Sequence, residues 1–314
     1  MELRCASLVS TILPLLILFL QEPACGGVGR HHSWLHTLDD YASWNMPSEA
    51  MFLNRADELS LAFKGAGRAV KVLLIGACDG TRDGLIDRLL NQSHWKGTLV
   101  EPEMANYEEL RLYTSSASDR LTLLNVAVND VCPTPATTNL TFLRVKPDRA
   151  HRYPHWFSKE IGSVDNNITR GITTFFSTLN ETSFRGTEAF TARRQDFDLV
   201  NQKVDCMTPD QFLLPNSTLT FSRRHESFDV VKIDAEGRDV AILVKLLESM
   251  RSLHVPLPIL ILIESKFASQ ESQTTLLRAS DHLGYKSTLR YFKNPSQEWI
   301  SRNDALFFLQ SFPY

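Results

Sequence analysis

The fold is decided by residues 73–84, LLIGACDGTRDG, where an apolar run stops at a glycine loop. The run ends at Gly76, and two further glycines follow with Asp79 and Asp83 among them. Glycine at this point either makes a tight strand-to-helix turn or lets the backbone approach a ligand closely. Carboxylates here would repel a pyrophosphate, and the loop lacks both the GxGxxG spacing and the P-loop lysine. The loop therefore predicts a ligand with few or no phosphates.

Strand and helix patterns alternate on both sides of this loop. Strands are predicted at 70–76, 97–102, 120–128, 227–237 and 258–265, and helices at 48–64, 80–91, 103–114, 238–250 and 270–283. The strands are apolar without strict alternation, which is typical of a parallel sheet covered on both faces. YKSTLRYF and ALFFLQSF predict two final strands that pair antiparallel at one edge. The fold class is therefore α/β, with a doubly wound (Rossmann-like), mostly parallel seven-stranded sheet.

Length and composition are those of a globular chain. The sequence has 314 residues, 43% of them hydrophobic and 22% charged, with a net charge of −3. No basic field indicates a nucleic-acid partner. We predict a signal peptide over 1–27, an N-terminal extension with a helix over 28–69, and an α/β domain over 70–314. An irregular insertion at about 129–203 separates the third and fourth strands of that domain.

The N-terminus has the pattern of a secretory signal peptide. Arg4 precedes an apolar run over residues 8–20, and small residues follow up to Gly27. The alternative is an uncleaved membrane anchor, but the run is shorter than the ~20 residues that a spanning helix needs, and Pro14 interrupts it. We expect no stable membrane span after cleavage.

Sequons and cysteines agree with passage through the secretory pathway. Asn-x-Ser/Thr sequons begin at Asn91, Asn139, Asn167, Asn180 and Asn216. A bridge between Cys132 and Cys206 would suit an oxidising compartment and would leave Cys78 as a thiol, although the sequence leaves the pairing open. The prediction is a secreted or lumenal (endoplasmic reticulum or Golgi) N-glycosylated protein.

Glu101 narrows the ligand further. It ends the second strand, about 20 residues after the glycine loop, where an acid can bind both hydroxyls of an adenosine ribose. The alternative is a solvated acid before Pro102. With the acidic loop, the ribose role predicts an adenosine ligand that is free of phosphate and positively charged. S-adenosylmethionine fits, because acidic groups attract its ammonium and its sulfonium.

Four stretches then carry a family resemblance: IGACDGTRDGLI, LVEPEMANYEEL, LLNVAVND and VVKIDAEGRDVAIL. In this order they resemble the FkbM-type S-adenosylmethionine-dependent methyltransferases, over roughly 70–130 and 204–265. The resemblance implies that the cofactor loop is formed by Gly76, Ala77, Asp79 and Gly80, and that Glu101 holds the ribose. It also implies that Val126 and Ala127 lie beside the adenine. Asp234 and Glu236 would face the transferring methyl. Two positions depart from the family pattern, since Leu74 replaces an acid and Cys78 replaces an asparagine.

The acids of the KIDAEG motif also have a chemical logic of their own. Asp234 and Glu236 lie in a turn where both carboxylates can reach the crevice, one as general base and the other to orient the acceptor or bind a cation. The alternative is that they serve as N-terminal charges for the helix that follows. Glu264, at the end of the fifth strand, is a lower-ranked candidate. His151 and His155 lack further ligands nearby, so we predict no metal site.

These observations predict an S-adenosylmethionine-dependent methyltransferase that methylates an oxygen of a carbohydrate or another small hydroxyl acceptor in the secretory pathway. Leu74 favours the alternative, a methyltransferase fold that binds or interacts without catalysis. A nucleotide-dependent oxidoreductase is disfavoured by the acidic loop and by the absent GxGxxG.

Overall fold

The computed structural model describes residues 48–132, 139–146, 148, 162–163, 199–214, 227–264, 270–288 and 304–309. The predictions for the N-terminal segment, for the two histidines of the insertion and for three of the sequons lie outside the described residues. Among the described helices, none combines the length and the apolar character needed to cross a lipid bilayer.

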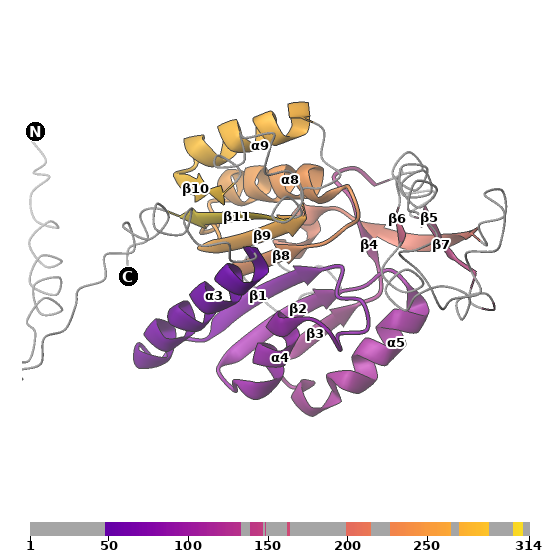
Figure 1. Ribbon diagram of the computed structural model, residues 1–314, viewed down its shortest axis with the longest axis horizontal. Helices are drawn as coiled ribbons and strands as arrows, with labels where there is room; N and C mark the ends of the chain where they lie inside the picture. The colour runs from indigo at the N-terminus through magenta and orange to yellow at the C-terminus, as the bar shows by residue number, and fades with distance from the viewer. Residues whose placement is uncertain are drawn as a thin grey trace, which may run out of the picture. The chain divides into compact units, whose positions relative to one another are not determined.

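A seven-stranded sheet organises the described residues, in the order β10-β11-β9-β8-β1-β2-β3 (Figure 1). Its strands are β1 (Val70–Ile75), β2 (Trp95–Val100), β3 (Leu121–Leu124), β8 (Val230–Ile233), β9 (Leu260–Glu264), β10 (Tyr285–Ser287) and β11 (Asp304–Leu309). Every pairing is parallel except those of β11, which runs antiparallel to both β9 and β10. The predicted doubly wound, mostly parallel seven-stranded sheet is confirmed.

Helices cover both faces of this sheet, as Figure 1 shows. One face carries α3 (Ser48–Gly65), α4 (Gly84–Asn91) and α5 (Met104–Tyr113), and the other carries α8 (Asp239–Ser252) and α9 (Gln270–His282). Successive side chains of β1 point to opposite faces. Leu73 therefore packs in the core with α8 and Leu74 in the core with α3 and α4, and both are fully buried.

Two of the predicted elements differ from the structure. The run 120–128 is two strands and not one: β3 stays in the large sheet, and β4 (Ala127–Val128) joins a second sheet. The break falls at Asn125, whose side-chain amide donates to the carbonyls of Glu101 and Pro102 and thereby turns the chain away from β2. The two final strands do pair antiparallel at one end of the sheet, but β11 lies inside and β10 forms the edge.

The second sheet lies at the carboxyl end of the large one. Its order is β4-β7-β5-β6, with β5 (Asn139–Val145), β6 (Gly162–Ser163) and β7 (Leu199–Met207). A disulfide joins Cys132 to Cys206, so of the pairings that the sequence left open the structure has this one, and Cys78 stays outside it. After β7 a 3-10 helix, η5 (Pro209–Phe212), returns the chain to the core.

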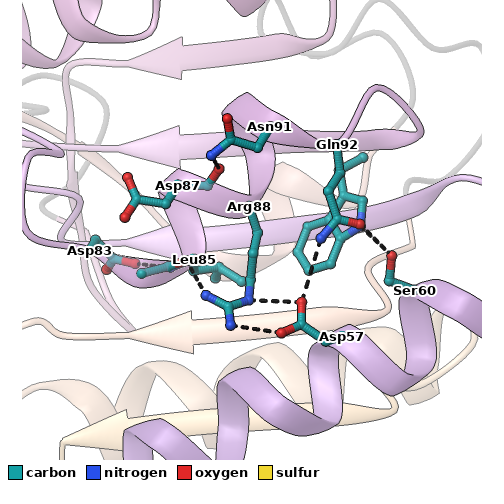
Figure 2. A network of polar contacts seen from close by, with 10 residues as sticks. Asp57, Ser60, Asp83, Leu85, Asp87, Arg88, Asn91 and Gln92 are labelled. Atoms are coloured by element: carbon teal, nitrogen blue, oxygen red, sulfur yellow. Dashed lines mark hydrogen bonds and ion pairs between the residues drawn. The ribbon is translucent and has the colours of Figure 1, made fainter.

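Helix α3 is fastened to α4 by a polar network that Figure 2 shows. Arg88 donates from Nε and Nη2 to the two carboxylate oxygens of Asp57, at 2.9 and 2.7 Å. The Trp95 indole donates to the Ser60 hydroxyl, and Ser60 donates to Gln92. Thus α3, which the sequence assigned to an N-terminal extension, is an integral part of the cover over the sheet.

Candidate active site

The site forms where the chain reverses its direction of travel across the sheet. β1 lies in the middle, with β2 and β3 on one side and β8 and β9 on the other. In open α/β sheets, ligands bind at such a switch point, beyond the carboxyl ends of the strands. The two loops that leave β1 and β8 touch there: the Asp234 N–H donates to the Ile75 carbonyl at 2.9 Å.

Gly76 shows how closely these loops approach. A Cβ atom at this position would lie 1.8 Å from the carbonyl oxygen of Asp234, and the residue has a φ of 82°. Only glycine satisfies both conditions, because other residues rarely adopt positive φ and would clash with the backbone. Gly76 therefore brings the predicted cofactor loop against the predicted catalytic loop.

The rest of the glycine loop holds its first aspartate inside. The Asp79 side chain is buried and accepts hydrogen bonds from the Thr81 N–H and hydroxyl, at 3.0 and 2.8 Å. Ala77 is buried, while Cys78 and Gly80 adopt φ of 50° and 80°. The loop thus turns twice through left-handed backbone and keeps a carboxylate beneath it.

Asp83 has a structural role at the start of α4. It is the N-cap of α4 and accepts from the N–H groups of Leu85 and Ile86. Its other oxygen accepts from the Lys232 ammonium at 2.7 Å, and Glu49 of α3 accepts from the same ammonium at 3.0 Å. Burial lowers the pKa of Lys232, but these two carboxylates outweigh it and raise the pKa above its usual value. The lysine is an ion-paired residue of β8.

Glu101 is fixed at the end of β2 by two backbone donors. Its carboxylate accepts from the Cys78 N–H and from the Glu103 N–H, both at 2.9 Å. Burial raises the pKa of Glu101 from 4.5 to about 8, and the charges of Asp234 and Asp79 add to the rise. These two hydrogen bonds fix the orientation of the Glu101 carboxyl in the absence of a ligand. Because its pKa is raised, ionisation of Glu101 at neutral pH requires a group nearby that favours the charged form.

The segment predicted beside adenine links the two sheets. Val126 follows the turn at Asn125, and Ala127 opens β4 in register with Cys206. Ala127 is buried and packs with Phe142 and Val204 of the second sheet. The residues expected near adenine therefore belong partly to the second sheet.

The loop after β8 is shaped by an aspartate that the sequence analysis did not select. Asp239, the first residue of α8, accepts from the N–H groups of Ala235 and Gly237, at 3.1 and 3.0 Å. Glu236 has a φ of 46° and Gly237 a φ of 101°, so the turn is tight. Burial, and then the charge of Asp234, raise the pKa of Asp239 to about 7.

The structure gathers the candidate acids. Asp234, Glu236 and Glu264 each offer a carboxylate oxygen, and these oxygens lie within 4.8 Å of one another. Glu264, at the end of β9, therefore lies beside the two acids of the KIDAEG motif. At this spacing three carboxylates can share a proton or hold a cationic group, and the predicted absence of a metal stays a prediction.

Leu74, where the family has an acid, lies fully buried in the core beneath α3 and α4. Its register partner across the sheet is Lys232. Asp83 and Glu49 neutralise the charge of that lysine, so Lys232 does not need an acid at position 74 as its partner. β1 accordingly presents no acid to a ligand, and the acids of the crevice come from the loops after β1, β2 and β8 and from the end of β9.

The described residues suit S-adenosylmethionine. Gly76 lets the loops after β1 and β8 meet, and Asp79 and Asp234 both act electrostatically on Glu101. A cation among three carboxylates is favourable, whereas a pyrophosphate is not. The arrangement fits a positively charged adenosine derivative.

Residues 75–290 match the family model of the methyltransferase FkbM domain. Among solved structures, the chain is similar to methyltransferase FkbM from Methylobacillus flagellatus KT, with 11% identity, a TM-score of 0.36, and coverage of 76% of this chain and 43% of that one. It is also similar to cofactor-bound Rv0187 from MTB, with 12% identity, a TM-score of 0.32, and coverage of 82% and 81%. No curated protein sequence matches it.

The structural similarities are remote, and the family model carries the assignment, since it spans more than half of the chain. The chain belongs to the FkbM methyltransferase domain family, a family of S-adenosylmethionine-dependent methyltransferases.

Proposed function

We propose that this chain methylates a hydroxyl oxygen of a carbohydrate or another small acceptor in the secretory pathway, with Asp234 as the general base. The observation that carries the proposal is the backbone contact between Gly76 and Asp234 at the switch point of the sheet. Through it, the loop that would hold the cofactor and the loop that would receive the acceptor share one crevice.

The residues divide the work as follows. When bound, S-adenosylmethionine supplies a methyl group that its sulfonium already activates, so the protein needs to align, exclude water and accept a proton. Glu101 would accept hydrogen bonds from the two ribose hydroxyls, and the 76–80 loop would enclose the methionine end. Asp234 would take the proton of the acceptor hydroxyl as its oxygen gains the methyl group. Glu236 and Glu264 would orient the acceptor.

The compartment is supported by independent features. The disulfide between Cys132 and Cys206 forms and persists in oxidising compartments. The sequons and the apolar N-terminal segment point to the same route. Carbohydrate hydroxyls are abundant there, which is why we place a glycan or a small hydroxyl compound first among acceptors.

One observation favours a second function, a binding module without catalysis. The family acid at the end of β1 is replaced by Leu74, which is fully buried in the core. The methionine end of the cofactor then lacks one carboxylate. Such a chain would keep the adenosine contacts of Glu101 and lose efficient transfer.

A methyl-transfer assay separates the two functions. The full chain, secreted from eukaryotic cells, is incubated with methyl-labelled S-adenosylmethionine and a panel of sugars, oligosaccharides and small alcohols. Asp234→Asn should lower kcat by about 100-fold or more, because the acceptor hydroxyl then has no general base. Asp119→Asn, an exposed aspartate after α5, is the control and should leave transfer unchanged. Equal transfer by Asp234→Asn would refute the base, and binding without transfer to any acceptor would favour the binding module.

A further inference from the structure

Arg144 joins the second sheet to the cofactor crevice. It lies on β5, which pairs with β7, and β7 pairs with the short strand β4 that follows Val126. Its side chain is 14% exposed, although it comes from a segment that the sequence presents as an irregular insertion. A nearly buried guanidinium requires partners, and its partners lead to the ribose acid.

Those partners form a short relay. Arg144 makes an ion pair with Glu103 and donates from Nη1 to the side-chain oxygen of Gln202 on β7 at 3.1 Å. Glu103 is the N-cap of α5, where its carboxylate accepts from two N–H groups of the first turn. The N–H of Glu103 in turn donates to Glu101. The Arg144 guanidinium therefore holds Glu103, and the backbone N–H of Glu103 holds the Glu101 carboxylate.

Arg144 also acts on the charge of Glu101 directly. Burial lowers the pKa of Arg144, while the negative charge of Glu101 opposes that decrease. Because the attraction is mutual, the guanidinium favours the ionised form of Glu101. Among the described residues, several groups act on Glu101 from the elements around it. Cys78 and Asp79 lie in the loop after β1, and Glu103 and Asn106 lie at the start of α5. Asp234 lies in the loop after β8, and Arg144 lies on β5. The guanidinium opposes the carboxylates of this set.

We propose that Arg144 is a positioning residue for the cofactor, which holds the Glu101 carboxyl toward the ribose hydroxyls and favours its ionised form. The proposal rests on the proposed cofactor site. The proposal gives the inserted segment a function, because the second sheet then supplies the guanidinium that offsets the negative charges around Glu101. An ionised carboxylate offers both oxygens as acceptors, whereas protonation turns one of them into a donor, so losing the cation weakens binding most where Glu101 tends to keep its proton.

The test is a calorimetric titration of the full chain with S-adenosylhomocysteine from about pH 6.5 to about pH 9.5. If removing the cation raises the pKa of Glu101 by about one unit, Arg144→Gln should bind about tenfold more weakly near neutral pH and approach wild type at high pH. Arg144→Lys keeps the charge and should recover most of the affinity. The control is Arg111→Gln, because Arg111 forms an exposed ion pair with Glu108 on α5, and this variant should match wild type.

Two results would overturn the proposal. One is unchanged affinity in Arg144→Gln. The other is an equal loss at every pH with no recovery in Arg144→Lys, which would mean that the substitution only loosens the second sheet.

A measurement without cofactor keeps this inference separate from the proposed function. The carboxyl carbon of Glu101, labelled with ¹³C and assigned by its absence in Glu101→Gln, is titrated by NMR in wild type and in Arg144→Gln. The midpoint should move upward by about one pH unit in Arg144→Gln and stay in place in Arg111→Gln. If wild type binds no S-adenosylhomocysteine but the midpoint moves, the cofactor assignment fails and the electrostatic link stands. An unmoved midpoint refutes the link.

Discussion

Single residues in the two loops adopt backbone conformations that few side chains tolerate. Cys78 and Glu236 have φ of 50° and 46°, although neither is glycine. Left-handed backbone costs an ordinary residue roughly 1–2 kcal/mol, and asparagine and glycine bear it best. Both residues belong to the loops that meet at the switch point. Strained backbone of this kind is common at functional sites.

Cys78 allows a direct test of this strain. Cys78→Asn should raise the free energy of unfolding by about 0.5–1 kcal/mol, because asparagine adopts positive φ more readily. Cys78→Ala removes the thiol and keeps the strain, so it is the matched control and should not stabilise. Denaturant unfolding at neutral pH measures both variants. Stabilisation by alanine as large as that by asparagine would show that the thiol, and not the backbone, is the cause.

Glu101 predicts a pH dependence of stability. The folded chain keeps this proton up to about pH 8, whereas an unfolded glutamate releases it near 4.5. Between these values the folded state binds one more proton, so the contribution of Glu101 to stability falls as pH rises. Glu101→Gln cannot titrate and should therefore gain stability relative to wild type between about pH 5 and about pH 8, by on the order of a few kcal/mol at most.

Denaturant unfolding of cofactor-free protein at several pH values provides the measurement. Glu108→Gln, an exposed glutamate on α5, should follow wild type throughout. A constant difference between Glu101→Gln and wild type across this range would contradict the raised pKa.

For single residues, the sequence predicts the candidate site residues that lie in recognisable motifs. It does not predict the residues that hold those site residues in place. The glycine loop, Glu101 and Asp234 follow from strand ends and ligand charge. Asp239 and Arg144 do not, because their partners are backbone donors in a tight turn and a carboxylate on a distant helix. An acid two residues after the glycine of the KIDAEG motif was the available signal for Asp239. No local pattern places Arg144.

Among the elements, α3 shows what helical periodicity leaves out. Its periodicity predicts the helix correctly, and the structure adds that Phe52, Leu59 and Phe63 are buried in the core of the sheet. Lys232 and the Asp57–Arg88 pair fasten it to β8 and α4. Only the tertiary structure shows that an amphipathic helix before the first strand packs on that sheet.

Two leucines of α3 test its integration. Leu59 is 2% exposed and Leu61 is 72% exposed, on the same helix two residues apart. Leu59→Ala should lower the free energy of unfolding by about 2–5 kcal/mol, since it removes buried methyl groups and leaves a cavity. Leu61→Ala should change it by less than about 0.5 kcal/mol. If both variants unfold alike, α3 does not belong to the core of the sheet.

The elements around Asn125 show the limit of periodicity. An unbroken apolar run predicts one strand over 120–128, yet a single side-chain amide divides it between two sheets. Hydrogen bonds from a side chain to backbone carbonyls of another strand leave no trace in the local pattern.

Taken as a whole molecule, the chain combines a methyltransferase fold with sequons and an apolar N-terminal segment that predict the secretory route. Asn91 is an exposed residue at the end of α4, and its sequon lies among the described residues. Protein made in eukaryotic cells should shift in gel mobility on endoglycosidase treatment, and Asn91→Gln should remove one step of that shift. Asn54→Gln, an exposed asparagine outside any sequon, should behave as wild type. No shift on treatment would contradict the secretory assignment.

The central claim is that an acidic glycine-loop crevice at the β1–β8 switch point binds a cationic, phosphate-free adenosine derivative. Calorimetric titration of the full chain with S-adenosylmethionine and with NAD at neutral pH tests it most directly. We predict one site for S-adenosylmethionine, a loss of affinity of about tenfold or more in Glu101→Gln, and no binding of NAD. The absence of S-adenosylmethionine binding, equal affinity in Glu101→Gln, or a preference for NAD would contradict the account.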